Sequence, residues 1–516
     1  MKNVSLFLIF IFSISFQVYS QKSKDSIILF SDLKYHSDFE KEALYNFVKN
    51  KKDTFNLFLA IDENIPAEIV NSDYKTYSEI FEILNQKNIQ SKNLNRKIKI
   101  AYSNVHDRFL KKYNDIEFFP AIFQSGTYNC VTASILYAMI FNKLEIPYKI
   151  MASANHVYLV ANPGSNSIVV ETTNPNFELA IFNGEFKQQY VNYLRNSKLL
   201  SEAEYKNKSV EEIFEEKFKE VNEAEFNNLI GFQYYNKALM KLQNQDIEEA
   251  LKLIQKAYYF NPDQQVKMLL FTTLLYEIEK CTFDKVHDID YLAQFSRFEN
   301  TDINNIVAIF KNVISYYLQF KSKESYCDSL YQRLITQIPD KKLSDEISFN
   351  YNLMMGYHFM QSDKVEKYMA GALEIKSDYV DAYVILESYL SRKIYRIPSS
   401  TALLDTINQL EKRYPFEGMS PIINEFKLIA DLKIANDLYG DKKIKEGDKY
   451  LQEFETKCAL PLDAESNQVL MHWIENTYRT IAIYYFYQGN KQRAKEYIAR
   501  GLKYVPNSKF LESAVY

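Results

Sequence analysis

Glycine and proline are both scarce in this chain, with 11 glycines and 12 prolines among 516 residues. Average usage, about 7% glycine and about 5% proline, would give roughly 36 and 26. A β-sandwich or β-barrel needs many tight turns, and glycine supplies the positive φ angles that such turns require. The scarcity therefore argues against an all-β architecture for most of the chain and favours long helices joined by short loops.

Charge and hydrophobicity exclude several classes of protein. A hydrophobic content of 47% excludes a mostly disordered chain. The formal net charge of −4 gives no reason to expect nucleic-acid binding. The sequence contains no phosphate-binding loop, no HExxH motif and no Cys/His zinc spacing, so we predict neither a cofactor nor a metal site.

The first twenty residues have the pattern of a secretory signal peptide. A basic start at Lys2 is followed by an uncharged stretch from Val4 to Tyr19 and by the small residue Ser20. We predict cleavage after Ser20, with an uncleaved anchor as the alternative. No second apolar stretch reaches the length of about 20 residues that spans a bilayer. The mature chain is therefore predicted to be periplasmic or secreted, without a membrane span.

The four cysteines are scattered and form no CxxC motif. Such spacing in a large chain is not that of a disulfide scaffold. The sequence leaves open whether two of Cys281, Cys327 and Cys458 form a disulfide.

The second half of the chain has a helical pattern with an internal repeat. Small residues let paired helices approach closely, and proline ends a helix. Two segments share this pattern with steps of seven and then five residues: Ala250, Ala257 and Pro262, and Ala494, Gly501 and Pro506. A weaker copy runs from Tyr351 to Ser377.

This spacing resembles that of tetratricopeptide repeats, most clearly over residues 231–264, 347–378 and 475–508. The resemblance implies an all-α repeat domain over residues 201–516, with a concave surface that binds a protein partner. An irregular helical domain with a chance match is the alternative.

Cys130 opens a predicted apolar helix. Asn129 is the expected N-cap, and apolar residues follow at helical spacing: Val131, Ile135, Leu136, Met139 and Ile140. A thiol at a helix N-terminus lies near amide donors and the positive end of the helix dipole. Both favour the nucleophilic thiolate.

A predicted β-hairpin follows this helix. His156 begins an alternating strand, Pro163-Gly164 supplies a turn, and the return strand ends at Glu171. A histidine on one strand and a carboxylate on its neighbour can lie side by side. The carboxylate then orients the imidazole, and the imidazole activates a thiol.

The order of cysteine, apolar helix, short strands, histidine, turn and acid resembles the core of the transglutaminase-like superfamily, a branch of the papain-like cysteine fold. The resemblance covers residues 95–180 and implies an α+β domain over residues 21–200. It makes Cys130 the nucleophile, His156 the general base and acid, Glu171 the orienting acid, and the Gln124 side chain an oxyanion-hole donor. The family usually has an aromatic residue where Asn129 stands and Asp-Pro where Glu171-Thr172 stands.

The sequence thus predicts a mainly α chain in which an α+β transglutaminase-like domain precedes tetratricopeptide-like helices. The expected activity is that of a thiol-dependent peptidase, amidase or acyltransferase acting on a peptide or protein amide bond. The alternative is a catalytically inactive assembly protein in which the helical repeats recruit a protein partner.

Overall fold

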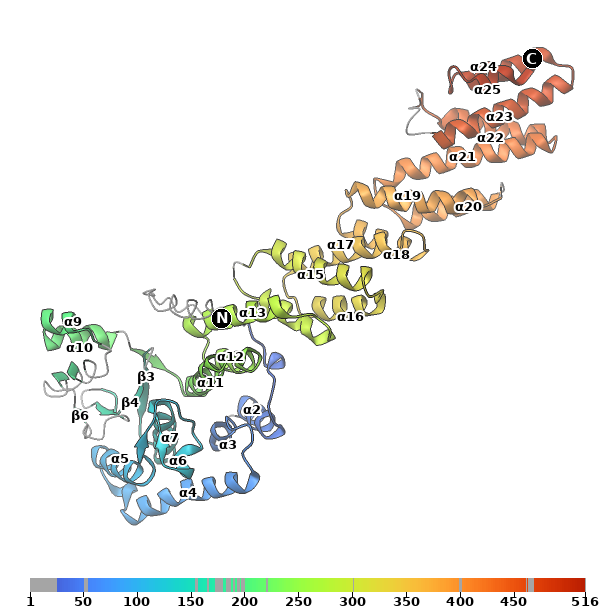
Figure 1. The fold of residues 1–516 in the computed structure, drawn as a ribbon. Coiled ribbons are helices and arrows are strands. Elements are labelled where there is room, and N and C mark those ends of the chain that lie inside the picture. The colour runs from blue at the N-terminus through green and yellow to red at the C-terminus, as the bar shows by residue number, and fades with distance from the viewer. Residues whose placement is uncertain are drawn as a thin grey trace. The chain divides into compact units, whose positions relative to one another are not determined.

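The chain divides into two compact units. In this computed structural model, unit 1 comprises Met1–Thr282 and Asp290–Asn300, and unit 2 comprises Phe283–Ile289 and Thr301–Tyr516. The structure describes residues 26–50, 54–153, 156–164, 167–171, 180–181, 187–188, 191–192, 195, 200–219, 221–299, 301–398, 401–460, 462 and 468–515. The described residues are mainly helical with a small sheet region, as the scarcity of glycine and proline predicts (Figure 1). The predicted signal peptide, residues 1–20, lies outside the described residues.

Helices form most of the first part of unit 1. They are η2 (Phe30–Asp32), α2 (Asp38–Asn50), α3 (Thr54–Leu59), α4 (Ala67–Gln86), η3 (Ile89–Ser91), α5 (Leu94–Phe109), α6 (Ala121–Gln124) and α7 (Cys130–Leu144). The helix α7 is buried along almost its whole length, with Ala133, Leu136 and Phe141 inaccessible to solvent. It is the central helix against which the sheet packs (Figure 1).

The main sheet has the strand order β6-β5-β4-β3-β7, and every neighbouring pair is antiparallel. Its strands are β3 (Tyr148–Ala152), β4 (Val157–Ala161), β5 (Ile168–Val170), β6 (Ala180–Ile181) and β7 (Asn222–Ala224), and a separate parallel pair joins β1 (Lys112–Tyr113) to β2 (Thr127–Tyr128). The predicted hairpin is confirmed, since β4 pairs with β5 and Gly164 in the turn has a φ of 143°. Ser134 of α7 donates a hydrogen bond to the carbonyl of Val157, 3.1 Å away, and so ties α7 to β4.

Further helices of unit 1 follow the sheet strands or lie around β7 in the described part of the chain. They are α9 (Glu202–Asn207), α10 (Val210–Lys219), α11 (Phe226–Gln243), α12 (Ile247–Phe260), α13 (Gln264–Lys280) and α14 (Asp290–Phe295). The helices α11 and α12 pack together, and α11 also contacts α7. This helix pair is the first of the two segments that share the seven-and-five spacing. It belongs to the compact unit that contains the sheet, whereas the sequence suggested a boundary near residue 200.

Buried polar side chains explain why the α11–α12 pair belongs to unit 1. The Gln233 side-chain amide accepts from the backbone N–H of Phe119 (3.0 Å) and donates to the carbonyl of Phe58 (3.1 Å). The Lys256 ammonium lies 2.6 Å from the Glu40 carboxylate, with both side chains almost inaccessible to solvent. Separating this buried ion pair would leave an uncompensated charge, which is strongly destabilising. The ion pair therefore holds the α11–α12 pair against the N-terminal helices.

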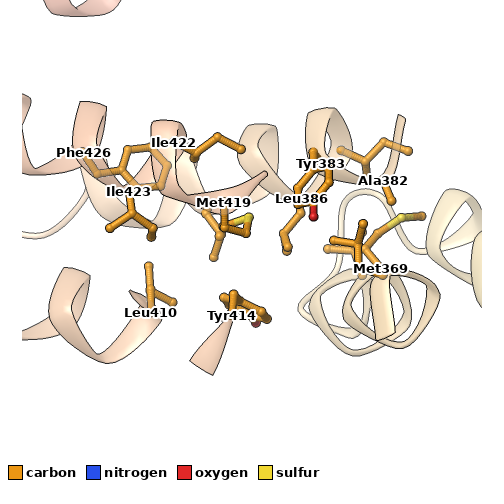
Figure 2. Close-up of a cluster of buried hydrophobic side chains, with 14 of the residues drawn as sticks. Met369, Ala382, Tyr383, Leu386, Leu410, Tyr414, Met419, Ile422, Ile423 and Phe426 are labelled. Carbon is orange, nitrogen blue, oxygen red and sulfur yellow. The ribbon is translucent and has the colours of Figure 1, made fainter. Parts of the chain in front are cut away.

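Unit 2 is built from paired helices. They are η4 (Val286–Ile289), α15 (Ile303–Gln319), α16 (Glu324–Ile335), α17 (Lys341–His358), α18 (Lys364–Ile375), α19 (Val380–Tyr395), α20 (Thr401–Arg413), α21 (Met419–Gly440), α22 (Ile444–Lys457), α23 (Gln468–Tyr487), α24 (Lys491–Leu502), α25 (Lys509–Glu512) and η5 (Ser513–Val515). The closest pairs are α17 with α18, α21 with α22, and α23 with α24. One of its hydrophobic cores gathers side chains from α17 to α21, among them Met369, Leu386, Leu410 and Met419 (Figure 2).

Small residues lie where the α23–α24 pair packs most closely. Ala494 is completely buried, and a Cβ atom added at Gly501 would lie 3.0 Å from the Tyr478 side chain. A larger residue at either position would therefore push the two helices apart. Within the described residues, no helix combines the length and apolar character that crossing a bilayer requires.

Candidate active site

Cys130 is the first residue of α7, and the predicted N-cap role of Asn129 is confirmed. The Asn129 side-chain oxygen accepts from the backbone N–H of Thr132, and the Thr132 hydroxyl accepts from the backbone N–H of Asn129, both at 2.9 Å. The Asn129 side-chain NH₂ donates to the carbonyls of Asp115 (3.2 Å) and Glu117 (3.0 Å). These four hydrogen bonds fix the backbone that carries the thiol.

Two backbone donors lie beside the thiol. The first N–H groups of a helix have no acceptor within that helix. Asn129 accepts from the N–H groups of Thr132 and Ala133, so that among the described contacts those of Cys130 and Val131 are the N–H groups without such an acceptor at the start of α7. Such amides stabilise negative charge that develops near a helix N-terminus.

His156 lies directly before β4 and contacts both Cys130 and Glu171. The distance from His156 Nε2 to a Glu171 carboxylate oxygen is 2.9 Å. The Cys130 thiol is hydrogen-bonded to the same ring. Nε2 is the nitrogen that faces Glu171, and Nδ1 is the second ring nitrogen. The structure thus brings three of the four predicted site residues together in the order Cys130, His156, Glu171.

The protonated form of His156 is stabilised at this site. Burial by itself lowers the pKa of the imidazole, but the charge of Glu171 and the hydrogen bonds with Cys130 and Glu171 outweigh it and raise the pKa well above its usual value. A protonated imidazole carries a proton on each nitrogen and can therefore donate to both of its partners.

The three side chains differ in their accessibility. His156 and Glu171 are almost fully buried, with 8% and 10% of their side-chain surfaces exposed. Cys130 is partly exposed. Cys130 is therefore the most accessible of the three residues, whereas the imidazole–carboxylate pair is shielded from water.

Gln124, the fourth predicted site residue, is not joined to this group by any hydrogen bond among the described residues. It is the last residue of α6, its side chain is exposed, and it is hydrogen-bonded to Asp73 of α4. It also lines a cavity of about 380 Å³, together with Lys237 and Met240 of α11. The offset of six residues from Cys130 suggested an oxyanion role for Gln124. In the structure its side-chain amide lies next to Asp73.

A cluster of possible metal ligands lies elsewhere in unit 1. Ligand atoms of His36, Glu63 and Glu249 lie within 4.8 Å of one another. Lysine ammonium groups already neutralise both carboxylates: Lys237 lies 2.8 Å from Glu63, and Lys252 lies 2.6 Å from Glu249. His36 Nδ1 lies 3.2 Å from Glu249. These contacts form an ion-pair network, and a divalent cation would compete with the two lysines.

One contact to the site has no local signal in the sequence. The Tyr102 hydroxyl donates to the backbone carbonyl of Glu171, 3.3 Å away. These residues are 69 positions apart, and a tyrosine in an amphipathic helix is an ordinary core residue. A sequence signal for this contact would require covariation between the two positions.

Comparison with known proteins assigns no family to this chain. Neither a scan against protein-family models nor a search of the curated proteins finds a match. The functional interpretation therefore depends on the geometry of Cys130, His156 and Glu171.

Proposed function

We propose that this chain is an exported, cysteine-dependent enzyme of the transglutaminase-like kind, acting on an amide or peptide bond. One observation carries the proposal: the thiol of a partly exposed cysteine at a helix N-terminus is hydrogen-bonded to a buried imidazole, and Nε2 of that imidazole lies 2.9 Å from a carboxylate. A catalytic triad of cysteine, histidine and acid is identified by this geometry and not by the positions of its residues in the sequence.

In the first step the Cys130 thiolate attacks the carbonyl carbon of the amide and forms a C–S bond. In this proposal the backbone N–H groups of Cys130 and Val131, at the N-terminus of α7, donate to the resulting oxyanion. Protonated His156 then transfers its Nδ1 proton to the amide nitrogen, the C–N bond breaks, and an amine leaves. The product is a thioester between the acyl group and Cys130.

In the second step a nucleophile attacks the thioester. Neutral His156 accepts a proton from water or from an amine, which adds to the carbonyl carbon, and the C–S bond breaks to release the Cys130 thiolate. Water gives hydrolysis, and an amine gives acyl transfer. Glu171 keeps its hydrogen bond to Nε2 in both steps and so holds Nδ1 toward the sulfur.

The helices of unit 2 serve, in this proposal, to bind a protein partner or substrate. The support is the repeated seven-and-five spacing and the tetratricopeptide-like pairing of α23 with α24, where Ala494 and Gly501 lie at the close contact. Solenoids of such pairs present extended binding surfaces.

The test is turnover of a library of peptide and amide substrates by the full mature chain. We expect Cys130→Ala to abolish acyl-enzyme formation and turnover. Cys458→Ala is the matched control, because Cys458 lies in unit 2 and is buried. We expect the control variant to retain wild-type turnover. If Cys130→Ala retained activity as well, the proposed mechanism would be wrong.

The second candidate is a catalytically inactive assembly protein. The hydrogen bond between Gln124 and Asp73 favours this candidate. In papain-like enzymes the amide of a glutamine at this offset donates to the oxyanion, whereas here Asp73 engages the amide. The two candidates differ in the reactivity of Cys130. An inactive protein needs no activated thiol, so His156→Ala would leave the rate of alkylation unchanged.

A further inference from the structure

The backbone of Glu171 is held at the point where β5 ends. The Tyr102 hydroxyl of α5 donates to the carbonyl oxygen of Glu171, and the two oxygens are 3.3 Å apart. The Glu171 carboxylate extends from the same residue to His156 Nε2. A hydrogen bond to this carbonyl limits rotation of the peptide that carries the carboxylate.

Tyr102 is itself fixed in place by α7. Its ring stacks on that of Tyr137, with 5.6 Å between ring centroids and 12° between ring planes, and on that of His106 at 5.9 Å and 18°. The Tyr137 hydroxyl donates to the Tyr102 carbonyl (3.2 Å). Tyr137 is completely buried, and burial raises its pKa well above the usual value, so this donor stays protonated.

These contacts connect the two ends of the site through a path separate from His156. Tyr137 belongs to the helix that Cys130 opens, and Tyr102 joins Tyr137 to Glu171. We propose that Tyr102 is a positioning residue for the reaction, acting through Glu171 to keep the His156 imidazole directed at the Cys130 sulfur. The inference rests on the proposed function, because it assigns a role in activating Cys130.

A role of this kind is distinguishable from a structural one. The Tyr102 side chain has two groups that can be tested separately. Its aromatic ring contributes to packing, whereas its hydroxyl makes the contact with Glu171. Tyr102→Phe removes the hydroxyl and keeps the ring. This substitution therefore separates positioning from packing.

The experiment measures the rate of alkylation of Cys130 by iodoacetamide in the full mature chain as a function of pH. We expect Tyr102→Phe to lower the rate at about pH 6, where an ordinary thiol is almost fully protonated, by about two- to tenfold. Glu171→Gln should shift the pH profile in the same direction and further. In strongly alkaline solution, where the thiol ionises without help from His156, Tyr102→Phe should match the wild type.

Tyr148→Phe is the matched control, because Tyr148 is a partly buried tyrosine of unit 1 whose hydroxyl is hydrogen-bonded to Asn142. It should leave the pH profile unchanged. Should Tyr102→Phe fail to fold, His106→Ala removes one of the stacked rings and should lower the rate at about pH 6 by a smaller factor.

An unchanged pH profile of Cys130 alkylation in Tyr102→Phe would overturn the positioning role of Tyr102, even if the melting temperature of the variant changed. If Tyr102→Phe does not fold, an unchanged profile in His106→Ala would overturn it. The proposed function itself fails in a different way. In that case the wild type shows no reactivity at about pH 6 that depends on His156, and the role of Tyr102 is overturned with it.

Discussion

Two cysteines on helices of this chain have opposite surroundings. Cys130 is the first residue of α7, is partly exposed and contacts His156. Cys327 lies within α16, is completely buried, and has its sulfur 3.9 Å from the Ile314 carbonyl. Burial raises the pKa of the Cys327 thiol to about 12, and the nearby charges of Asp328 and Glu324 add to this effect. The comparison teaches that the position of a cysteine along its helix decides whether it is a candidate nucleophile or a core residue.

The largest expected difference between the two thiols is in reactivity. Raising a thiol pKa from 9.0 to about 12 lowers its thiolate fraction at neutral pH about a thousandfold, and burial slows access further. We therefore expect iodoacetamide to label Cys130 at least about a thousandfold faster than Cys327 in the native chain. Peptide mass spectrometry over a time course measures both rates. Comparable labelling rates would contradict the distinction between Cys130 as a reactive thiol and Cys327 as a core residue.

Glu171→Gln tests why the two sites differ, since Cys327 has no such histidine–carboxylate pair within the described contacts. The pKa of His156 is raised in the folded chain. The stability linked to its proton is therefore fully present below the unfolded pKa, about 6.5, and is lost as the pH rises through the higher folded pKa. We expect Glu171→Gln to cost about 1.5–3 kcal/mol in this lower range of pH.

Urea unfolding of the wild type and Glu171→Gln at several pH values measures this loss. The difference between the two proteins should shrink as the pH rises above the folded pKa of His156. A difference that is constant with pH would show that the charge of Glu171 does not stabilise protonated His156.

The smallest expected effect is on stability when each thiol becomes a hydroxyl. Cys327→Ser places a polar group in a dry core and should cost about 1–2 kcal/mol. Cys130→Ser changes a partly exposed residue at a helix start, where serine is well tolerated, and should stay within about 0.5 kcal/mol. Chemical unfolding of both variants measures the two values. The reverse order would contradict the assignment of Cys327 as the core residue.

Local signals were sufficient to predict much of the site. The periodicity after Cys130 and the polar residue before it predicted α7 and its N-cap, because both depend on contacts within four residues. The turn at Pro163-Gly164 predicted the β4–β5 hairpin, which then places His156 and Glu171 on neighbouring chain segments. The contact between Cys130 and this pair could be predicted only from the family resemblance, because it depends on how the sheet packs on α7.

Contacts between distant residues explain what the sequence did not reveal. The side chain of Gln124 is bound to Asp73, about 50 residues earlier in the chain, and a spacing rule cannot anticipate that partner. The α11–α12 and α23–α24 pairs share one spacing of small residues, yet only the first lies in unit 1. Gln233 and Lys256 bind the α11–α12 pair to the rest of unit 1, through hydrogen bonds to residues more than 100 positions away.

The most direct test of the account is the pH dependence of the alkylation rate of Cys130 in the wild type and in His156→Ala. We predict that wild-type Cys130 keeps a high rate below about pH 7, where the imidazolium and thiolate form a pair, and that His156→Ala loses this rate and follows the ionisation of an ordinary thiol. Identical profiles for the two proteins would contradict the claim that His156 activates Cys130.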